Sequence, residues 1–391
     1  MKILHIVPSY LPAYRYGGPI ISVHALNKWL VRGGVAVTVF TTNADGPNRL
    51  NVVLNQEIDI DGVKVWYFPV SFPARWMYSS ALRRALKERT GEFDLVHVTS
   101  VFLAASTLAA SAARRAGKPY IISPRGSLMC EPLGMKSALK KRLYLALIER
   151  RNLAHAAAIH FTSETEREEY AGAGFPLRRA FVIPNGLDTE GWPPAAPGDF
   201  RSKWKISLDR RIVLAMGRIG WKKGFDTLIP ALARVAKKDP RVLLVISGSG
   251  DEGYKKNVQL LLSNYQLQKS ILFTGPFEGM NVPALTDADV FVLPSYSENF
   301  GMAVIQAMYA GLPVVVTPGV ALSREVADSG AGLVVEKDEA AVAGAILKVL
   351  GNRTVAHDMG VRGKSLVEKS FLAPKVAHAF REAYTELVRL A

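Results

Sequence analysis

The sequence is poor in cysteine and in acidic residues. Cys130 is the one cysteine among 391 residues, which excludes a disulfide-stapled scaffold and a multi-cysteine metal site. Only 34 Asp and Glu stand against 49 Lys and Arg, so the formal net charge is +15. Such a charge suits anionic partners, and we expect the protein to be able to sit against an anionic surface.

The sequence also lacks a long hydrophobic run. A membrane-spanning helix needs about 20 mainly apolar residues, and the nearest candidate without charged residues, 95–113, contains a histidine and five Ser or Thr. The first residues run directly into an apolar strand pattern at 3–7 rather than into a secretory signal. With 49% hydrophobic residues, disorder is excluded, and we expect a soluble, cytoplasmic protein.

Short β-type runs alternate with helical patterns along the chain, which predicts parallel sheets built from βαβ units. Residues 188–199 form a Pro/Gly-rich connector between two such series. We therefore predict an N-terminal domain at 1–190, a C-terminal domain at 191–373 and a last helix at 374–391 that could pack back on the first domain. Strands are predicted at 2–7, 35–41, 63–68, 95–98, 120–123, 157–162, 180–184, 211–217, 242–247, 271–274, 290–293, 314–317 and 332–335.

Three segments could bind an anion. Gly17 and Gly18 lie between the first strand and its helix, where glycines let backbone N–H groups approach a phosphate, although a plain turn explains them equally well. Arg218 and Lys223 follow a strand that ends at Gly217, the edge of an α/β sheet at which ligands bind. The glycine pair is neither a Walker loop nor a G-x-G-x-x-G fingerprint.

The third segment, 294–307, is the most specific. An apolar strand runs into a loop that carries Glu298 and then into a helix that begins near Gly301. Backbone N–H groups of 300–304 would point out of the start of that helix and suit an anion, whereas Glu298 would accept from sugar hydroxyls. A carboxylate favoured by the helix dipole is the simpler alternative.

In this order and spacing, the three segments, together with Ile183-Pro184-Asn185-Gly186-Leu187-Asp188 and Ser247-Gly248-Ser249-Gly250, resemble glycosyltransferase family 4 over nearly the whole chain. That family consists of retaining enzymes with the GT-B fold, two Rossmann-like, doubly wound α/β domains that face each other across a cleft. The resemblance implies a nucleotide-diphosphate sugar as donor, held mostly by the second domain, and an acceptor bound by the first. A UDP- or GDP-sugar is favoured over an ADP-sugar, and no further cofactor is expected.

The resemblance also implies roles for individual residues. Arg218 and Lys223 would neutralise the diphosphate, Glu298 would bind the transferred sugar, and residues 272–275 would lie near the nucleobase. The expected catalytic residues are Glu298, Arg218, Lys223 and Arg125. The expected donor-binding residues are Gly17, Gly18, Arg218, Lys223, Gly248, Gly250, Phe273, Thr274, Glu298, Asn299, Phe300, Gly301, Met302, Ala303, Val304 and Gln306.

Two residues depart from the family pattern. Gln306 stands where relatives usually carry a second glutamate that grips the ribose, and an amide offers one oxygen rather than two. Arg125 stands where many relatives carry a histidine close to the transferred sugar; it cannot act as a base but can hold a phosphate. His97 could contribute, but a structural histidine is the favoured interpretation.

We therefore predict a metal-independent, retaining glycosyltransferase that uses a glycan or lipid-linked acceptor in polysaccharide or glycolipid synthesis. The alternatives are a sugar-nucleotide epimerase of the same architecture and a sugar-nucleotide binding protein that has lost transfer. Asp287-Ala288-Asp289 has the D-x-D spelling of a metal site, but its place at the amino end of a strand favours a structural role. The other histidines show no pattern of a zinc site.

The segment 136–151 combines six basic residues with one glutamate and a leucine stripe. With Arg75-Trp76-Met77-Tyr78 and Arg83-Arg84, it predicts a face of the first domain for anionic lipid, which would make the protein peripheral at the inner face of the cytoplasmic membrane. An ordinary helix that buries its leucines is the alternative. No recognition motif for nucleic acid accompanies the charge, and the oligomeric state is left open.

Overall fold

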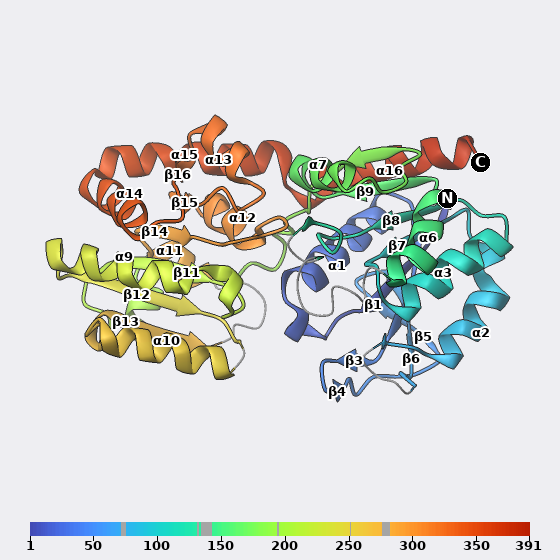
Figure 1. Cartoon of the computed structure of the whole chain (residues 1–391), viewed down its shortest axis with the longest axis horizontal. Helices are drawn as coiled ribbons and strands as arrows, with labels where there is room; N and C mark the ends of the chain where they lie inside the picture. Colours follow the sequence, from blue (N-terminus) through green and yellow to red (C-terminus); the bar gives the residue numbers. More distant parts are fainter. Residues whose placement is uncertain (72–75, 131–132, 134–142, 194, 251, 276–281) are drawn as a thin grey trace. The chain divides into compact units, whose positions relative to one another are not determined.

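The computed structural model describes all residues except 72–75, 131–132, 134–142, 194, 251 and 276–281 (Figure 1). The chain forms two compact units. Unit 1 comprises Met1–Asp188 together with Ala373–Ala391, and unit 2 comprises Thr189–Leu372. Each unit is described by itself. Among the residues so described, no helix combines the length and hydrophobicity that crossing a bilayer requires.

Unit 1 is built on an eight-stranded sheet of order β10-β9-β8-β7-β1-β2-β6-β5, so the chain order reverses at β1. Its strands are β1 (Lys2–Ser9), β2 (Ala36–Thr42), β5 (Glu57–Ile60), β6 (Val63–Phe68), β7 (Leu95–Thr99), β8 (Tyr120–Ser123), β9 (Ala158–Phe161) and β10 (Ala180–Val182), with a separate pair β3 (Ala44–Asp45) and β4 (Asn48–Arg49). All sheet neighbours are parallel except β5, which pairs antiparallel with β6 through a turn at Asp61-Gly62.

The helices of unit 1 cover both faces of this sheet. They are η1 (Tyr14–Tyr16), α1 (Gly18–Arg32), α2 (Ser80–Arg89), η3 (Thr90–Glu92), α3 (Ala104–Arg115), η4 (Leu145–Glu149), α6 (Arg150–His155), α7 (Glu164–Gly172) and α16 (Ala373–Arg389). The last of these comes from the far end of the sequence and packs beside α1 (Figure 1). Its residues Val376, Phe380, Tyr384 and Leu387, spaced three or four apart, are buried in one core with β1 and β2.

Unit 2 is a second doubly wound domain with a six-stranded parallel sheet of order β13-β12-β11-β14-β15-β16, which reverses at β11. Its strands are β11 (Arg211–Met216), β12 (Val242–Ser247), β13 (Ile271–Gly275), β14 (Val290–Leu293), β15 (Val314–Val316) and β16 (Gly332–Val334). Because β11, β12 and β14 are covered on both faces, their sequences are continuous apolar runs rather than alternating ones.

The helices of unit 2 are α8 (Asp199–Lys203), η5 (Trp221–Lys223), α9 (Phe225–Lys238), α10 (Glu252–Asn264), η6 (Gln268–Ser270), α11 (Val282–Asp287), α12 (Met302–Tyr309), α13 (Ser323–Ser329), α14 (Glu339–Gly351) and α15 (Arg353–Ser370). The helices α9 and α14 pack on each other and share a core with the sheet, while α12 packs against β14, β15 and α15. The predicted architecture of two doubly wound, Rossmann-like α/β domains is confirmed.

Candidate donor-binding site and associated polar networks

The predicted site segments of unit 2 converge at the point where the strand order of the sheet reverses. The strands β11 and β14 are neighbours there, and their carboxyl ends lead into Gly217-Arg218 and into Pro294. Open α/β sheets bind ligands at such a reversal. A small depression at this edge is lined by Met216, Gly217, Arg218, Lys223 and Pro294, among others.

The loops at this edge pack backbone against backbone. Gly248 has a φ of +152°, and a Cβ atom there would lie 1.9 Å from the carbonyl oxygen of Gly217. Gly224 has a φ of +69°, and its Cβ would lie 1.9 Å from the carbonyl oxygen of Pro294. A Cβ at Gly250 would likewise lie 2.0 Å from a backbone oxygen. These close approaches account for glycine at all three positions, and contact of Gly248 and Gly250 with a donor stays a prediction.

The pairing of backbone groups continues beyond the ends of the strands. Gly217 N donates to Ser247 O at 2.9 Å, and Tyr296 N donates to Lys222 O at 2.8 Å. Because each loop is tied to its neighbour in this way, the side chains that it carries are held on a rigid frame.

Lys223 and Glu298 form the central ion pair of this edge. They lie on different loops, 75 residues apart, and the Lys223 ammonium donates to Glu298 Oε2. The two side chains are only 17% and 24% exposed. The backbone of Glu298 is fixed on both sides, since its N–H donates to Gly319 O at 2.8 Å and its carbonyl accepts from Ala321 N at 3.0 Å. The ammonium group of Lys223 and the carboxylate of Glu298 are therefore fixed side by side at this edge of the sheet.

The ammonium group of Lys223 reaches back over the end of β11. A Cβ atom at Gly217 would lie 3.5 Å from Lys223 Nζ, within van der Waals contact of the ammonium group. Arg218, the next residue, is exposed at the same edge. Two cations therefore stand where the strand ends, one fixed by Glu298 and one exposed to solvent.

The N-terminus of α12 lies directly after Glu298. Its N-cap is Gly301, with a φ of +99°, and no side chain of the described residues caps the helix. Uncapped backbone N–H groups at a helix start carry partial positive charge and bind anions. Met302 and Gln306, four residues apart, share a face of α12 and are both half-buried. Phe300 is buried against Phe371 and holds the loop to the unit.

Two predicted nucleobase contacts lie on the other side of β11. Phe273 and Thr274 are half-buried in β13, which is two strands away from β11 at the edge of the sheet. The hydroxyl of Thr274 is buried and has no partner among the residues that the structure describes. The remaining predicted contacts, Asn299, Ala303 and Val304, belong to the Glu298 loop and the first turn of α12.

Gly17 and Gly18 lie in unit 1, where Gly17 follows η1 and Gly18 is the first residue of α1. Gly17 has a φ of +74° and precedes α1, whose first turn contains Pro19 and is not capped by a side chain of the described chain. This is also the reversal point of the sheet of unit 1, between β1 and β7. The glycine pair is therefore placed at a helix N-terminus as predicted, and its contact with a phosphate stays a prediction.

Arg125 follows β8 in unit 1 and has a φ of +54°. Its guanidinium donates through Nη1 to Asn185 Oδ1, in the Ile183–Asp188 segment, whereas its Nε has no partner within the described residues. Burial lowers the pKa of Arg125 to about 10, so it stays charged at neutral pH. The buried Glu166, whose pKa burial raises, accepts from Gly126 N at 2.5 Å and holds the same turn. This turn therefore holds the positively charged side chain of Arg125 in a fixed position.

A buried chain of histidines in unit 1 escaped the sequence analysis, apart from the structural role preferred for His97. His97 Nδ1 lies 2.7 Å from the hydroxyl of Tyr384, its Nε2 lies 2.6 Å from Ser123 Oγ, and Ser123 Oγ lies 2.7 Å from His160 Nδ1. His160 Nε2 ends the chain at the carbonyl oxygen of Ile183, at 2.8 Å. The carbonyl of Ile183 can only accept, so a neutral His160 donates to it through Nε2 and accepts at Nδ1. The same reasoning applies at Ser123 and His97, so all hydrogen bonds of the chain run in one direction, from Tyr384 to Ile183.

His5 lies beside this chain. It is paired in register with His97 on the neighbouring strand, and the two rings stack with centroids 4.2 Å apart. Its ring nitrogens bond to Asn27 Oδ1 at 2.7 Å and to Thr99 Oγ1 at 2.8 Å. Burial lowers the pKa of His5 and of His160 to about 3 and that of His97 well below its usual value, so the three rings are neutral. One sequence signal was available: each histidine interrupts an otherwise apolar strand.

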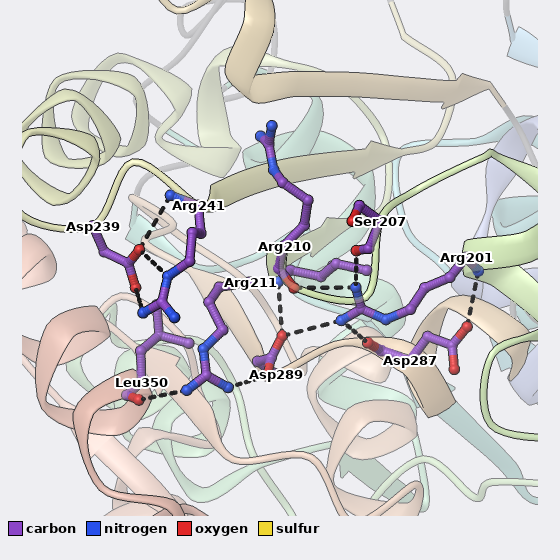
Figure 2. A network of polar contacts seen from close by, with 10 residues as sticks. Arg201, Ser207, Arg210, Arg211, Asp239, Arg241, Asp287, Asp289 and Leu350 are labelled. Carbon is purple, nitrogen blue, oxygen red and sulfur yellow. Dashed lines mark hydrogen bonds and ion pairs between the residues drawn. The ribbon is translucent and has the colours of Figure 1, made fainter.

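The two aspartates of the D-x-D motif, Asp287 and Asp289, hydrogen-bond to other protein groups and have a structural role (Figure 2). Asp287 accepts from the backbone N–H groups of Gly198 and Arg201, at 2.6 and 2.9 Å, and so holds the start of α8. Asp289 accepts from Ile212 N at 2.8 Å and from the Arg211 guanidinium at 3.0 Å. Within the described ranges, no group of three or more His, Cys, Asp or Glu side chains could hold a metal ion.

The basic segment 136–151, predicted to face lipid, lies partly outside the described residues, which exclude residues 136–142 with four of its six basic residues, and Arg75 is excluded as well. Its described part begins at Leu143, and the side chains of Leu143 and Leu147 are 61% and 69% exposed. These two leucines are therefore not buried by unit 1 as an ordinary helix would require, and a role toward lipid stays a prediction.

Comparison with known proteins gives matches for both halves of the chain. Residues 17–186 match the family model of a glycosyl transferase 4-like domain, and residues 198–366 match that of glycosyl transferases group 1. Among curated relatives, the GDP-mannose-dependent alpha-(1-6)-phosphatidylinositol monomannoside mannosyltransferase of Mycolicibacterium smegmatis is 28% identical over 79% of this chain and 81% of that protein. The D-inositol 3-phosphate glycosyltransferase of Geodermatophilus obscurus is 25% identical over 86% of this chain and 78% of that protein.

Solved structures share the fold over the full length. Sucrose-phosphate synthase from Thermosynechococcus elongatus superposes with a TM-score of 0.80 at 22% identity and covers 100% of both chains. Anabaena HepE, solved in complex with UDP and glucose, superposes with a TM-score of 0.77 at 20% identity over 98% of this chain and 99% of that one. These likenesses show the GT-B fold.

Proposed function

We propose that this chain, a group 1 glycosyltransferase with a glycosyl transferase 4-like N-terminal domain, transfers a sugar from a nucleotide-diphosphate sugar to a glycan or lipid-linked acceptor with retention of anomeric configuration. One observation carries the proposal: the Lys223–Glu298 ion pair stands beside Arg218 and the uncapped start of α12, where the sheet of unit 2 reverses.

The proposed donor pose follows from the charges at this edge. The diphosphate lies against Arg218, Lys223 and the first N–H groups of α12, all of which favour an anion. An ammonium group has three donors, so Lys223 can keep Glu298 and still donate to a phosphate oxygen. Glu298, an acceptor only, then binds hydroxyls of the transferred sugar, and Gln306 on the next turn of α12 accepts from the ribose.

Breaking the anomeric bond places negative charge on the departing diphosphate. Cations and helix-terminal N–H groups that are fixed beforehand stabilise that charge without a reorganisation cost. We assign no side chain as nucleophile, and the acceptor hydroxyl attacks the face from which the diphosphate leaves, with a diphosphate oxygen taking its proton. Within unit 1, Arg125, which is held by Asn185, offers a separate positive charge to an anionic group of a substrate.

The proposal includes no metal, because the oxygens of Asp287 and Asp289 already accept hydrogen bonds from protein groups. A UDP- or GDP-sugar is the proposed donor; the mycobacterial relative is named for GDP-mannose, and HepE was solved with UDP. We also propose that the basic residues of unit 1 bring the enzyme to an anionic membrane surface when the acceptor is a lipid.

The first test is a thermal-shift screen with UDP, GDP and ADP, since a ligand that binds the folded state raises the melting temperature. We expect a shift with UDP or GDP, and we expect Lys223→Ala and Arg218→Ala to abolish both the shift and the transfer of a labelled sugar. Lys238→Ala, an exposed lysine at the other end of α9, is the matched control. Near-normal rates in both site variants would overturn the assignment.

The same assay separates the alternatives. Isomerisation of the donor without an added acceptor would identify an epimerase. Donor binding without turnover on any acceptor would identify a binding protein that has lost transfer.

A further inference from the structure

A groove lies on unit 1 between the last turn of α1 and the first turns of α16, and its volume is about 270 Å³. Apolar side chains from both helices line it, among them Trp29 and Ala377. Its basic residues are Arg32, His378 and Arg381, and none of the described residues that line it is acidic. The groove therefore combines apolar surface with positive charge, which suits an organic anion.

Arg381 is held by neighbours on both helices. Its guanidinium donates through Nη1 to Gly33 O at 3.1 Å and through Nη2 to His378 Nδ1 at 3.0 Å. Because arginine only donates, His378 Nδ1 accepts, and a neutral ring then carries its hydrogen on Nε2, which lies 3.4 Å from Glu382 Oε1. Two of the five N–H donors of the guanidinium are used in these contacts, so others are left for a ligand. Arg381 also covers the carbonyl of Gly33, which would otherwise present the negative end of α1 to an anion.

Arg32 supplies a second guanidinium group to the groove. Its Cζ atom lies 4.7 Å from the centroid of the Trp29 ring, and this cation–π contact holds an exposed side chain. The indole Nε1 of Trp29 is buried and has no hydrogen-bond partner among the residues that the structure describes. Buried N–H groups of folded proteins usually have a partner, which can be an ordered water or an ion. The groove thus offers two held guanidinium groups and a lining indole whose N–H finds no acceptor in the described chain.

We infer that this groove is a second anion-binding site, which takes a phosphate ester with a small organic body. Guanidinium groups bind phosphate oxygens through two N–H groups at once. A phosphate monoester carries nearly two negative charges at neutral pH, enough to engage both Arg32 and Arg381. A carboxylate carries a single charge and engages only one of them. The apolar side chains of the groove then pack against the organic part of the ester.

This site is separate from the predicted donor site. Gly18 begins α1 and Trp29 lies in its last turn, so about 16 Å of helix separate them. The residues that line the groove belong to unit 1, whereas Arg218, Lys223 and Glu298 belong to unit 2. Failure of the proposed function would therefore leave this site untouched. A soluble phosphate ester and the head group of a lipid such as phosphatidic acid share the required chemistry, and the experiment distinguishes these two sources.

Calorimetry with sn-glycerol 3-phosphate on the full-length protein tests the site. The wild type should bind this probe, and Arg32→Gln and Arg381→Gln should each weaken binding about tenfold, the effect of losing one charged hydrogen bond. Arg389→Gln, which removes the same charge from the exposed far end of α16, is the matched control and should leave the affinity unchanged. D-glycerate, a carboxylate of similar size, should bind about tenfold more weakly than the phosphate ester. Hydrogen exchange should show that the probe protects residues 27–35 and 374–384.

Cosedimentation with vesicles of phosphatidic acid and phosphatidylcholine in equal parts identifies the source of the phosphate. Vesicle binding that falls in Arg32→Gln but not in Arg389→Gln assigns the groove to the lipid head group. Unchanged vesicle binding together with weakened binding of glycerol 3-phosphate assigns it to a soluble ester. Arg32 is exposed, so its variant keeps the test valid even where Arg381→Gln disturbs the packing of α16. Any of three results would overturn the inference: a wild type that binds neither probe, a control variant as weak as Arg32→Gln, or glycerate that binds as tightly as glycerol 3-phosphate.

Discussion

Acidification from pH 7.5 to 5.5 should destabilise unit 1 through its three buried histidines, His5, His97 and His160. In the folded state their pKa values lie far below the ordinary value because burial penalises the charged ring, with His5 and His160 at about 3. In the unfolded chain each titrates near pH 6.5. Below that pH the unfolded state binds protons that the folded state does not, so stability is complete above pH 6.5 and is lost as the pH falls.

The size of the effect follows from this difference in proton binding. Each histidine contributes a loss of about 1.4 kcal/mol between pH 7.5 and 5.5, and the three together about 4 kcal/mol. This is a large fraction of the roughly 5–15 kcal/mol by which a domain is stable. Two buried carboxyls, Glu149 and Glu166, act in the opposite direction, because burial raises their pKa values and they gain stability as the pH falls. A variant that lacks one histidine therefore separates the contribution of the histidines to the pH dependence of stability from that of the carboxyls.

The assay is hydrogen exchange with mass spectrometry in increasing urea, read on peptides from β1 and β7, so that the free energy of unfolding is measured for unit 1 alone. His97→Gln keeps a neutral donor and acceptor between Tyr384 and Ser123. It should remove the contribution of one histidine from the pH dependence of the unfolding free energy, a difference of about 1.4 kcal/mol over the two pH units. A pH slope in the variant identical to that of the wild type would refute the assignment of a neutral, buried His97 ring.

Three further predictions concern unit 2. Gly248→Ala should lower the free energy of unfolding of this unit by about 3 kcal/mol in urea, because the new Cβ would lie 1.9 Å from a backbone oxygen. The control Gly344→Ala, in the open interior of α14, should be neutral or stabilising, and equal effects of the two substitutions would contradict the packing argument. Glu298→Gln should lower turnover about 100-fold. The thermal shift with UDP or GDP should be kept or increased, because the Lys223 ammonium group no longer pairs with a carboxylate that competes with the diphosphate. Unchanged turnover would exclude Glu298 from the site. Gln306→Glu should tighten donor binding about fivefold by calorimetry, since a carboxylate accepts more strongly than an amide; weaker binding would place the ribose elsewhere.

The architecture was readable from local patterns. Strands buried on both faces, such as β11 and β12, are unbroken apolar runs, and the alternation with helices predicts their parallel order. The strand β5 was missed because it is only four residues long and the turn signal Asp61-Gly62 follows it directly. The segments predicted to bind the donor in unit 2 were chosen for the same local reason, since Gly217-Arg218 and the Glu298 loop come after the strands β11 and β14.

Contacts between distant segments could not be derived in this way. The partners Lys223 and Glu298 are 75 residues apart, and His97 and Tyr384 are 287 residues apart. Each position could be assigned to the end or the middle of an element from its own neighbours in the sequence. Which elements are neighbours depends on strand order and on register, and these are decided by how the whole sheet packs its two faces. For this reason the charged residues of the predicted site could be named from the sequence, whereas the pairing of Lys223 with Glu298 and the buried histidine chain are visible only in the folded molecule.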